Sequence, residues 1–234
     1  VIIEKNRMKN LAIIPARGGS KRIPRKNIKL FMGKPIIAYS IETALQTGLF
    51  DEVMVSTDDE EVAEVACEYG ASVPFMRSEK TANDYATLAD VLHEVINKYA
   101  ENGERFDNMC CILATAPLIT SEQLLAAFEK LQISDELSTV YPVVQFSYPV
   151  QRCLQMNDKG LVSMKWPEYL CSRSQDLETL YHDSGTFYWH KVEKWCSGDI
   201  VRGAIVMNEL NVQDIDTETD WRLAELKYSI LNEL

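Results

Sequence analysis

The sequence lacks any long run of apolar residues. No stretch approaches 18 consecutive apolar residues, the length that a membrane-spanning helix needs. Residues 1–10 have neither the apolar core nor the small-residue cleavage site of a secretory signal. We therefore expect a cytoplasmic protein that is not exported and has no membrane partner. We interpret Met8 as the original start and residues 1–7 as an upstream extension, and we leave those seven residues out of the fold prediction.

Cysteine pairs with a metal-ligand spacing are also missing. The six cysteines include no C-x-x-C pair, and none lies beside a histidine at a zinc-site spacing. This argues against zinc and predicts buried, reduced thiols, as in cytosolic proteins.

Acidic residues are absent from one part of the chain. From Lys5 to Ile41 there are ten Lys or Arg and no Asp or Glu, whereas the rest has 14 basic and 35 acidic residues. The formal net charge is −11, and so acidic a remainder would repel a long polyanion. The pattern therefore argues against nucleic acid and favours a small, highly charged ligand held at one place.

The length and the periodicity predict a single α/β domain over residues 8–234. With 46% hydrophobic residues, 234 residues can bury one sizeable core. Strand-like and helix-like patterns alternate, and parallel neighbours in such a chain need helical crossovers, so we predict a three-layer, Rossmann-like fold with a mostly parallel sheet. The predicted strands are 10–15, 51–56, about 72–76, 108–113 and 203–208. The predicted helices are 35–48, 59–70, about 86–101, one beginning at Ser121, and 217–234, the last with Thr217 and Asp220 as a capping box.

The segment from about 138 to 190 departs from this alternation. It is β-like, rich in aromatic residues and divided by turns. We interpret it as a small β-rich insertion that projects from the main sheet.

The stretch AIIPARGGSKRIPRKN, residues 12–27, follows the first predicted strand, where open α/β sheets commonly bind phosphate. Gly18 and Gly19 allow backbone N–H groups to approach an anion, and Arg17 and Lys21 supply charged donors. The stretch contains neither G-x-x-x-x-G-K-[ST] nor G-x-G-x-x-G, so it is not a Walker A loop or a dinucleotide fingerprint. The alternative is a solvated basic loop, but six cations within residues 17–29 favour an anion site.

Two acids near the other end, Asp214 and Asp216, are separated by one residue. On an extended strand both carboxylates would point to one face, where a divalent cation such as Mg²⁺ would relieve their repulsion. The alternative is that Asp216 caps the following helix. Weaker candidates, each also compatible with an ordinary loop, are Arg77, Asn83, Asp84, His182 and Asp183.

Taken in order, these segments resemble the CMP-sialic acid synthetase (acylneuraminate cytidylyltransferase) family from Leu11 to Leu226. The resemblance is carried by IPARGGSKRIPRKN, FDEVMVSTDDEEVAEVACEYGASVPFMRSEKTANDYAT, TAPLIT and DIDTETD. CMP-Kdo synthetases are similar at the start, but they prefer R-Y-x-S-x-R-L-P-x-K-P. The chain has LATAPLI and YHDSG where sialic acid enzymes have L-Q-P-T-S-P-L-R and F-R-P-N-G. With SRSQDLE (172–178), these departures resemble the pseudaminic acid branch.

The resemblance implies a nucleotide-diphosphosugar-transferase fold and transfer of CMP from CTP to the anomeric hydroxyl of an acidic nine-carbon sugar. Pyrophosphate is the other product, Mg²⁺ the cofactor and pseudaminic acid the leading sugar. Synthesis of CMP-N-acetylneuraminate or another such sugar stays open, as does a non-catalytic nucleotide-binding module. The resemblance also implies a homodimer with a dimerisation arm inside residues 140–190, although packing of this segment within one chain is the alternative.

The implied site residues fall into four groups. Catalytic roles are implied for Arg17, Lys21 and Asp216. The implied nucleotide-binding residues are Ala16, Arg17, Gly18, Gly19, Ser20, Lys21, Lys26, Asn27, Arg77, Asn83 and Asp84. The implied sugar-binding residues are Thr87, Thr115, Arg173, Gln175, His182, Asp183 and Tyr188, and the implied metal ligands are Asp214 and Asp216.

Overall fold

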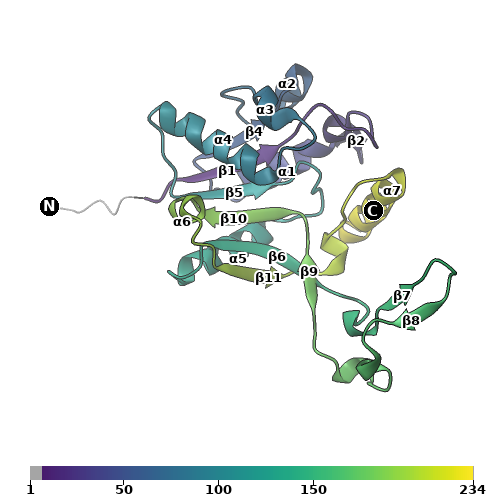
Figure 1. Ribbon diagram of the computed structural model, residues 1–234. Coiled ribbons are helices and arrows are strands. Elements are labelled where there is room, and N and C mark those ends of the chain that lie inside the picture. Colours follow the sequence, from purple (N-terminus) through teal and green to yellow (C-terminus); the bar gives the residue numbers. More distant parts are fainter. Residues whose placement is uncertain (1–6, 234) are drawn as a thin grey trace.

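A seven-stranded sheet forms the centre of the protein in the computed structural model, which describes residues 7–233 (Figure 1). Apart from Arg7, the interpreted upstream extension lies outside the described residues. The strand order is β11-β6-β10-β5-β1-β4, and β9 pairs with β6. The strands are β1 Asn10–Pro15, β4 Glu52–Ser56, β5 Asn108–Ile112, β6 Thr139–Gln145, β9 Tyr181–Asp183, β10 Phe187–Lys191 and β11 Arg202–Val206.

The sheet is mostly parallel, as predicted. β1 pairs in parallel with β4 and β5, and β11 pairs in parallel with β6. β10 is antiparallel to both of its neighbours, and β9 is antiparallel to β6. The carboxyl ends of β1, β4, β5, β6 and β11 therefore lie at one edge of the sheet, where ligands of open α/β folds bind.

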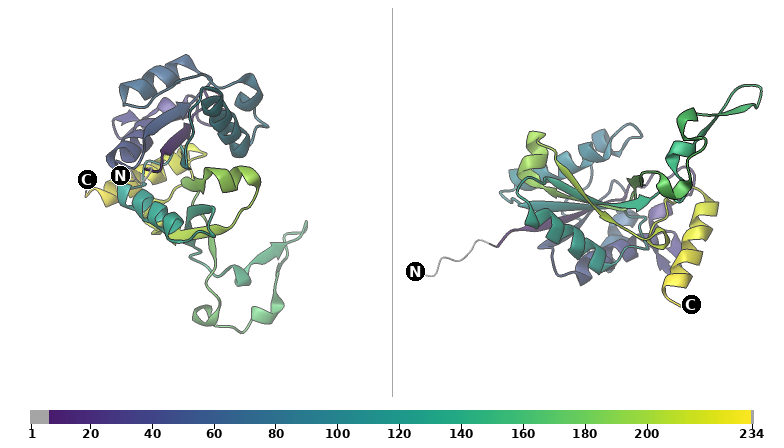
Figure 2. Two further views of the ribbon diagram at one scale, coloured as in Figure 1. Left: turned by 90° about the vertical axis from the view of Figure 1, so that its left-hand side faces the viewer. Right: turned by 90° about the horizontal axis from the view of Figure 1, so that it is seen from below.

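Helices cover both faces of the sheet, which gives the predicted three layers (Figure 2). The helices are α1 Ile36–Gln46, α2 Glu60–Glu68, α3 Glu79–Ala82, α4 Leu88–Glu101, α5 Ser121–Ile133, α6 Val192–Ser197 and α7 Glu218–Leu231. Ala12 and Ile14 of β1 pack in one core with α1, α2 and α5, whereas Leu11 and Ile13 pack in a second core with α4. All four side chains are fully buried, because alternate residues of a strand face opposite sides.

Local signals set the helix ends. Asp59 accepts a hydrogen bond from the backbone N–H of Val62 at the start of α2, and Gly70 beyond its end has a φ of +92°. Thr217 and Asp220 form the predicted capping box of α7.

Two parts of the fold prediction need correction. The predicted strand at 72–76 is wrong: only Ser72 bridges to Met54, and Pro74, which has no N–H, cannot extend the pairing. The short helices α3 and α6 were not predicted, because four and six residues are too few to show a helical period.

Residues 146–180 form an arm that extends away from the body (Figures 1 and 2). The arm contains the hairpin β7 (Leu154–Met156) and β8 (Val162–Met164). The strands on either side of it, β6 and β9, and the following β10 belong to the central sheet, so the projecting part is shorter than 140–190. The remaining short elements are the 3₁₀ helices η1 Lys26–Ile28, η2 Val150–Arg152, η3 Pro167–Tyr169, η4 Ser174–Asp176 and η5 Glu209–Asn211. A two-stranded antiparallel sheet is formed by β2 (Leu30–Phe31) and β3 (Lys34–Pro35).

Within residues 7–233, no helix is long and apolar enough to cross a membrane.

All six cysteines are free thiols, but the predicted burial holds only for Cys110 and Cys111 on β5. It is wrong for the four exposed ones, which lie on α2, on α6 and in the arm: Cys67, Cys153, Cys171 and Cys196.

Candidate functional site

A cavity of about 560 Å³ opens beyond the carboxyl ends of β1 and β5. Its walls come from the loop after β1, the segment from Arg77 to the start of α4, and the loop after β5. We call it the nucleotide cavity. Ten predicted site residues line it: Arg17, Ser20, Lys21, Lys26, Asn27, Arg77, Asn83, Asp84, Thr87 and Thr115.

Each of the six cations of residues 17–29 forms an ion pair inside the chain. Arg17 and Lys21 both bind Asp84, with Arg17 Nη1 2.7 Å from its Oδ1. The other four pair with acids at or just before the starts of α2 and α7: Arg25 with Asp59 and Glu61, Arg22 and Lys26 with Asp216, and Lys29 with Glu218. The sequence indicated an anionic ligand as the partner of these cations. The structure adds that carboxylates of the chain itself also pair with them.

Arg77 differs from these cations. It is 9% exposed and lines the cavity, yet no carboxylate in the described part of the chain lies within 4.0 Å of its guanidinium. Nε donates to Ser56 Oγ at 3.1 Å and Nη2 donates to the Ser56 carbonyl at 2.5 Å. Burial lowers the pKa of Arg77, so its charge is held at a cost that a bound anion would offset. Arg77 is therefore the side chain of this cavity best suited to an anionic ligand.

Gly18 has a packing role that the sequence did not indicate. The N–H of Gly18 donates to Asp58 Oδ1 at 3.0 Å, and the N–H of Ala16 donates to the Ser56 carbonyl at 2.9 Å, so both donors are engaged within the chain. A Cβ on Gly18 would lie 2.5 Å from Asp59 Oδ2, whereas one on Gly19 would meet nothing within 4 Å. Gly18 thus allows the loop to lie against the start of α2.

The first and last parts of the chain meet at Asp216. Its Oδ1 lies 2.8 Å from Arg22 Nη2 and 3.6 Å from Lys26 Nζ, which also donates to the carbonyl of Ile215 at 2.6 Å. Ile215 and Trp221 are buried in a third core with Ile23, Phe31, Ile36, Tyr39 and Ala224. This apolar packing places the D-x-D segment against the basic loop.

The alternative role of Asp216 as a helix cap is wrong, because Thr217 caps α7. The segment is also not a β-strand, contrary to the extended-strand expectation. Ile215 is nevertheless buried between an exposed Asp214 and a half-buried Asp216, so both carboxylates lie on the outer side of the segment.

A second cavity of about 460 Å³ contains Asp214 together with His182 and Asp183, and Leu113 lines both cavities. We call it the sugar cavity after the predicted sugar-binding residues His182 and Asp183 that line it. Tyr188 Oη donates to the carboxylate of Asp183 at 3.0–3.1 Å, and the N–H of Gly185 donates to it at 2.8 Å. Burial raises the pKa of Tyr188, with the charge of Asp183 adding to the effect, so this hydroxyl stays protonated.

Among the other predicted sugar-binding residues, Thr87 and Thr115 line the nucleotide cavity instead. Arg173 and Gln175 are exposed on the arm and line neither cavity, and Arg173 pairs with Asp176 at 2.7 Å. Within one chain the structure does not bring them to the site.

The carboxylates fit a hard divalent cation only in part. Asp214 belongs to the sugar cavity and Asp216 contacts the loop that lines the nucleotide cavity. In the described residues no group of three or more His, Cys, Asp or Glu could hold a metal. A Mg²⁺ ion here would be bound by one or two carboxylates, and water and substrate phosphates would complete its shell, as is usual for this ion.

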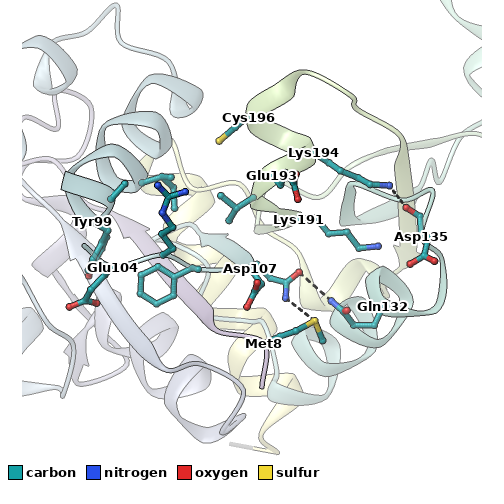
Figure 3. Close-up of a pocket in the computed structure, with 16 residues that line it drawn as sticks. Met8, Tyr99, Glu104, Asp107, Gln132, Asp135, Lys191, Glu193, Lys194 and Cys196 are labelled. Carbon is teal, nitrogen blue, oxygen red and sulfur yellow. Dashed lines mark hydrogen bonds between the residues drawn. The ribbon is translucent and has the colours of Figure 1, made fainter. Parts of the chain in front are cut away.

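A larger cavity of about 910 Å³ lies at the opposite edge of the sheet, near the first residues of β1 and β5 (Figure 3). None of the predicted site residues lines it. Its Lys191 and Lys194 donate to the backbone carbonyls of Ser134 and Asp135, and Asn108 bonds to Gln132. Size alone therefore does not identify the functional site.

A mostly parallel sheet with a cation-lined cavity beyond its carboxyl ends is typical of nucleotide-binding α/β proteins. A family model described as cytidylyltransferase matches residues 11–182, and the chain belongs to this family of nucleotidyltransferases. It is 44% identical to a pseudaminic acid cytidylyltransferase of Campylobacter jejuni over 97% of this chain and 99% of that protein. It is 34% identical to a CMP-N,N'-diacetyllegionaminic acid synthase of Legionella pneumophila over 93% and 95% of the two chains. A solved CMP:2-keto-3-deoxy-manno-octonic acid synthetase complexed with CTP shares the fold, with a TM-score of 0.68 and 20% identity over 97% of this chain and all of that one.

Sequence reasoning missed several residues of this region. Arg22 was counted among the loop cations, but nothing in the sequence showed that it faces Asp216. Asp58 and Asp59 contact the loop through Gly18 and Arg25, and Lys227 of α7 lines the sugar cavity. Only the three-dimensional arrangement reveals these contacts, since a local sequence pattern does not show which distant residues meet.

Proposed function

We propose that this protein transfers CMP from CTP to the anomeric hydroxyl of an acidic nine-carbon sugar, with pseudaminic acid as the substrate. The single observation that carries the proposal is that the two cavities adjoin at Leu113, where Asp214 lines the sugar cavity and Asp216 pairs with Arg22 and Lys26 of the nucleotide cavity. The names of the relatives at 44% and 34% identity support the choice of sugar class.

The chain's own residues bind and orient the triphosphate. Arg17, Lys21 and Arg77 line the nucleotide cavity and place positive charge where the pyrophosphate leaving group gains negative charge. Asp84 occupies Arg17 and Lys21 in the described structure, so phosphate binding exchanges one anion for another at these cations. When bound, Mg²⁺ on Asp214 and Asp216 would neutralise phosphate charge and help to align the reactants.

The sugar cavity supports an acceptor rich in hydroxyl and amide groups. His182, Asp183 and Tyr188 form a connected set of polar groups, and such a set rejects a sugar that leaves its members unpaired. The test is to incubate the purified protein with CTP, Mg²⁺ and each acidic nine-carbon sugar in turn, and to measure pyrophosphate. Pseudaminic acid is expected to give the highest kcat/KM. A higher value for N-acetylneuraminate would reassign the sugar, and no release with any sugar would contradict the proposal.

We also propose that the arm makes a homodimer and brings Arg173 and Gln175 to the partner's sugar cavity. Large apolar side chains are exposed along it, including Met156 at 72% and Leu161 at 64%, and such area seldom stays in water. Chromatographic mass at micromolar concentration is expected to be twice that of one chain. Met156→Glu should lower it, whereas Ile133→Glu, outside the arm, should not. A single-chain mass for the parent protein would contradict the dimer.

A further inference from the structure

Lys227 is a cation in the sugar cavity that no motif indicated. It is the one Lys or Arg among the described residues that line this cavity, whereas Asp183, Glu209 and Asp214 bring three carboxylates. A sugar that carries its own carboxylate would meet net repulsion in a cavity of this composition unless a cation faces it. Within one chain, the charge balance therefore makes Lys227 the side chain of this cavity best suited to face the carboxylate of an acidic guest.

The contacts of Lys227 hold its ammonium group at the wall of the cavity. Nζ donates to the carbonyl of Val212 at 2.6 Å and to the carbonyl of Glu209 at 3.1 Å. An ammonium group has three N–H bonds, so these two contacts leave one donor for a ligand. Both acceptors are neutral carbonyls, and no carboxylate in the described part of the chain forms an ion pair with Lys227.

The position of Lys227 also suits the reaction. It extends from α7, the helix that follows the D-x-D segment, and shares the sugar cavity with Asp214. Partial burial lowers its pKa, which agrees with a site that has lost part of its water and in which a charge-assisted hydrogen bond is correspondingly stronger.

From this arrangement we infer that Lys227 binds the carboxylate of the acidic sugar and thereby selects acidic over neutral acceptors. The inference rests on the proposed function, because it names the group in the chain that recognises the acid of that substrate. In this role Lys227 contacts the substrate but takes no part in bond making at phosphorus.

The test compares Lys227→Gln, which keeps a donor for the carbonyls but loses the charge, with Lys227→Arg, which keeps the charge. Pyrophosphate release is measured at saturating CTP against the concentration of the acidic sugar. We expect KM for the sugar to rise about 10-fold or more in Lys227→Gln, with KM for CTP unchanged, and to rise less in Lys227→Arg. The matched control is Lys130→Gln, since Lys130 also donates to a backbone carbonyl, that of Ala204, but lines neither cavity.

A second substrate separates recognition of charge from structural support. The sugar with its carboxylate converted to a primary amide should be a poor acceptor for the parent protein. With this amide, kcat/KM of Lys227→Gln should be only slightly below that of the parent protein. An unchanged KM for the acidic sugar in Lys227→Gln would overturn this inference and leave the proposed function intact. The same holds if the substitution lowers kcat/KM equally for the acid and for the amide. Failure of the parent protein to use any acidic sugar would overturn the proposed function and this inference together.

Discussion

The guanidinium of Arg22 lies 2.8 Å from the carboxylate of Asp216, although the two residues come from opposite ends of the chain. The contact joins the basic loop after β1 to the D-x-D segment before α7. It exists because Ile215 and Trp221 are buried with Ile23 and Phe31, so an apolar core rather than the ion pair holds the two segments together. The pair itself is partly exposed, with 67% of the Arg22 side chain and 36% of the Asp216 side chain accessible, and adds little to stability.

Asp216→Asn should therefore abolish function without unfolding the protein. The substitution removes a charge that the proposed Mg²⁺ needs, and we expect kcat/KM for pyrophosphate release to fall about 100-fold or more while the melting temperature changes little. The matched control is Glu218→Gln, which removes the exposed partner of Lys29 two residues further on. Parent-like turnover by Asp216→Asn would show that this carboxylate does not bind the metal.

Asp84→Asn should strengthen phosphate binding. Asp84 accepts bonds from both Arg17 and Lys21, which lowers its pKa, with the Lys21 bond as the larger cause. Removing its charge frees both cations, and exposed pairs of this kind predict an affinity gain of about two- to fivefold. Calorimetric titration with pyrophosphate measures the change, and Asp176→Asn in the arm is the control. Weaker binding by Asp84→Asn would mean that Asp84 positions the two cations instead of competing for them.

Gly18→Ala should destabilise the loop, and Gly19→Ala should not. The new Cβ on residue 18 would lie 2.5 Å from Asp59 Oδ2 and 2.8 Å from its Cβ, so the loop and the start of α2 must separate. Overpacking of this kind costs about 1–3 kcal/mol. Thermal or urea unfolding of the two variants gives the comparison, and equal stability of both would contradict the close approach.

Glu94 should make the region around the nucleotide cavity sensitive to acid. Burial alone would raise the pKa of Glu94, but hydrogen bonds from Lys98, Thr81 and Ser78 lower it to about 2. Because the folded pKa is below the unfolded one, the stabilisation is complete above about pH 4.5 and is lost as the pH falls towards 2. It amounts to about 3 kcal/mol.

Glu94→Gln should accordingly flatten the loss of unfolding free energy between pH 5 and 2. Glu101→Gln, at the exposed end of the same helix, serves as the control. Urea unfolding at several pH values provides the measurement, and identical pH profiles for parent and Glu94→Gln would show that this carboxylate is not the acid-sensitive group. Glu94 also bonds to Ser78 and Thr81 of the α3 turn, which leads directly to Asn83 and Asp84, so its loss should weaken CTP binding as well.

The elements that sequence predicted well depend on neighbours in the chain. The buried run of β1, the helix α2 and the capping box of α7 all follow from periodicity or from side chains within four residues of the backbone they satisfy. The prediction of a strand at 72–76 failed because apolar content alone does not show whether pairing with a neighbouring strand continues past Pro74. Most predicted nucleotide residues proved to share one cavity, because the loops that carry them all lie at the carboxyl edge of the parallel sheet.

The sequence by itself determined the order of the elements, the basic loop and the D-x-D pair, because these are local patterns of charge and hydrophobicity. Only the tertiary structure decided which acid meets each cation, that Arg77 is buried against Ser56 and that Lys227 lines the sugar cavity. The physical reason is that long-range contacts depend on how apolar surfaces pack. Burial of Ile215 beside Ile23 fixes where Asp216 lies, and no local pattern records that packing.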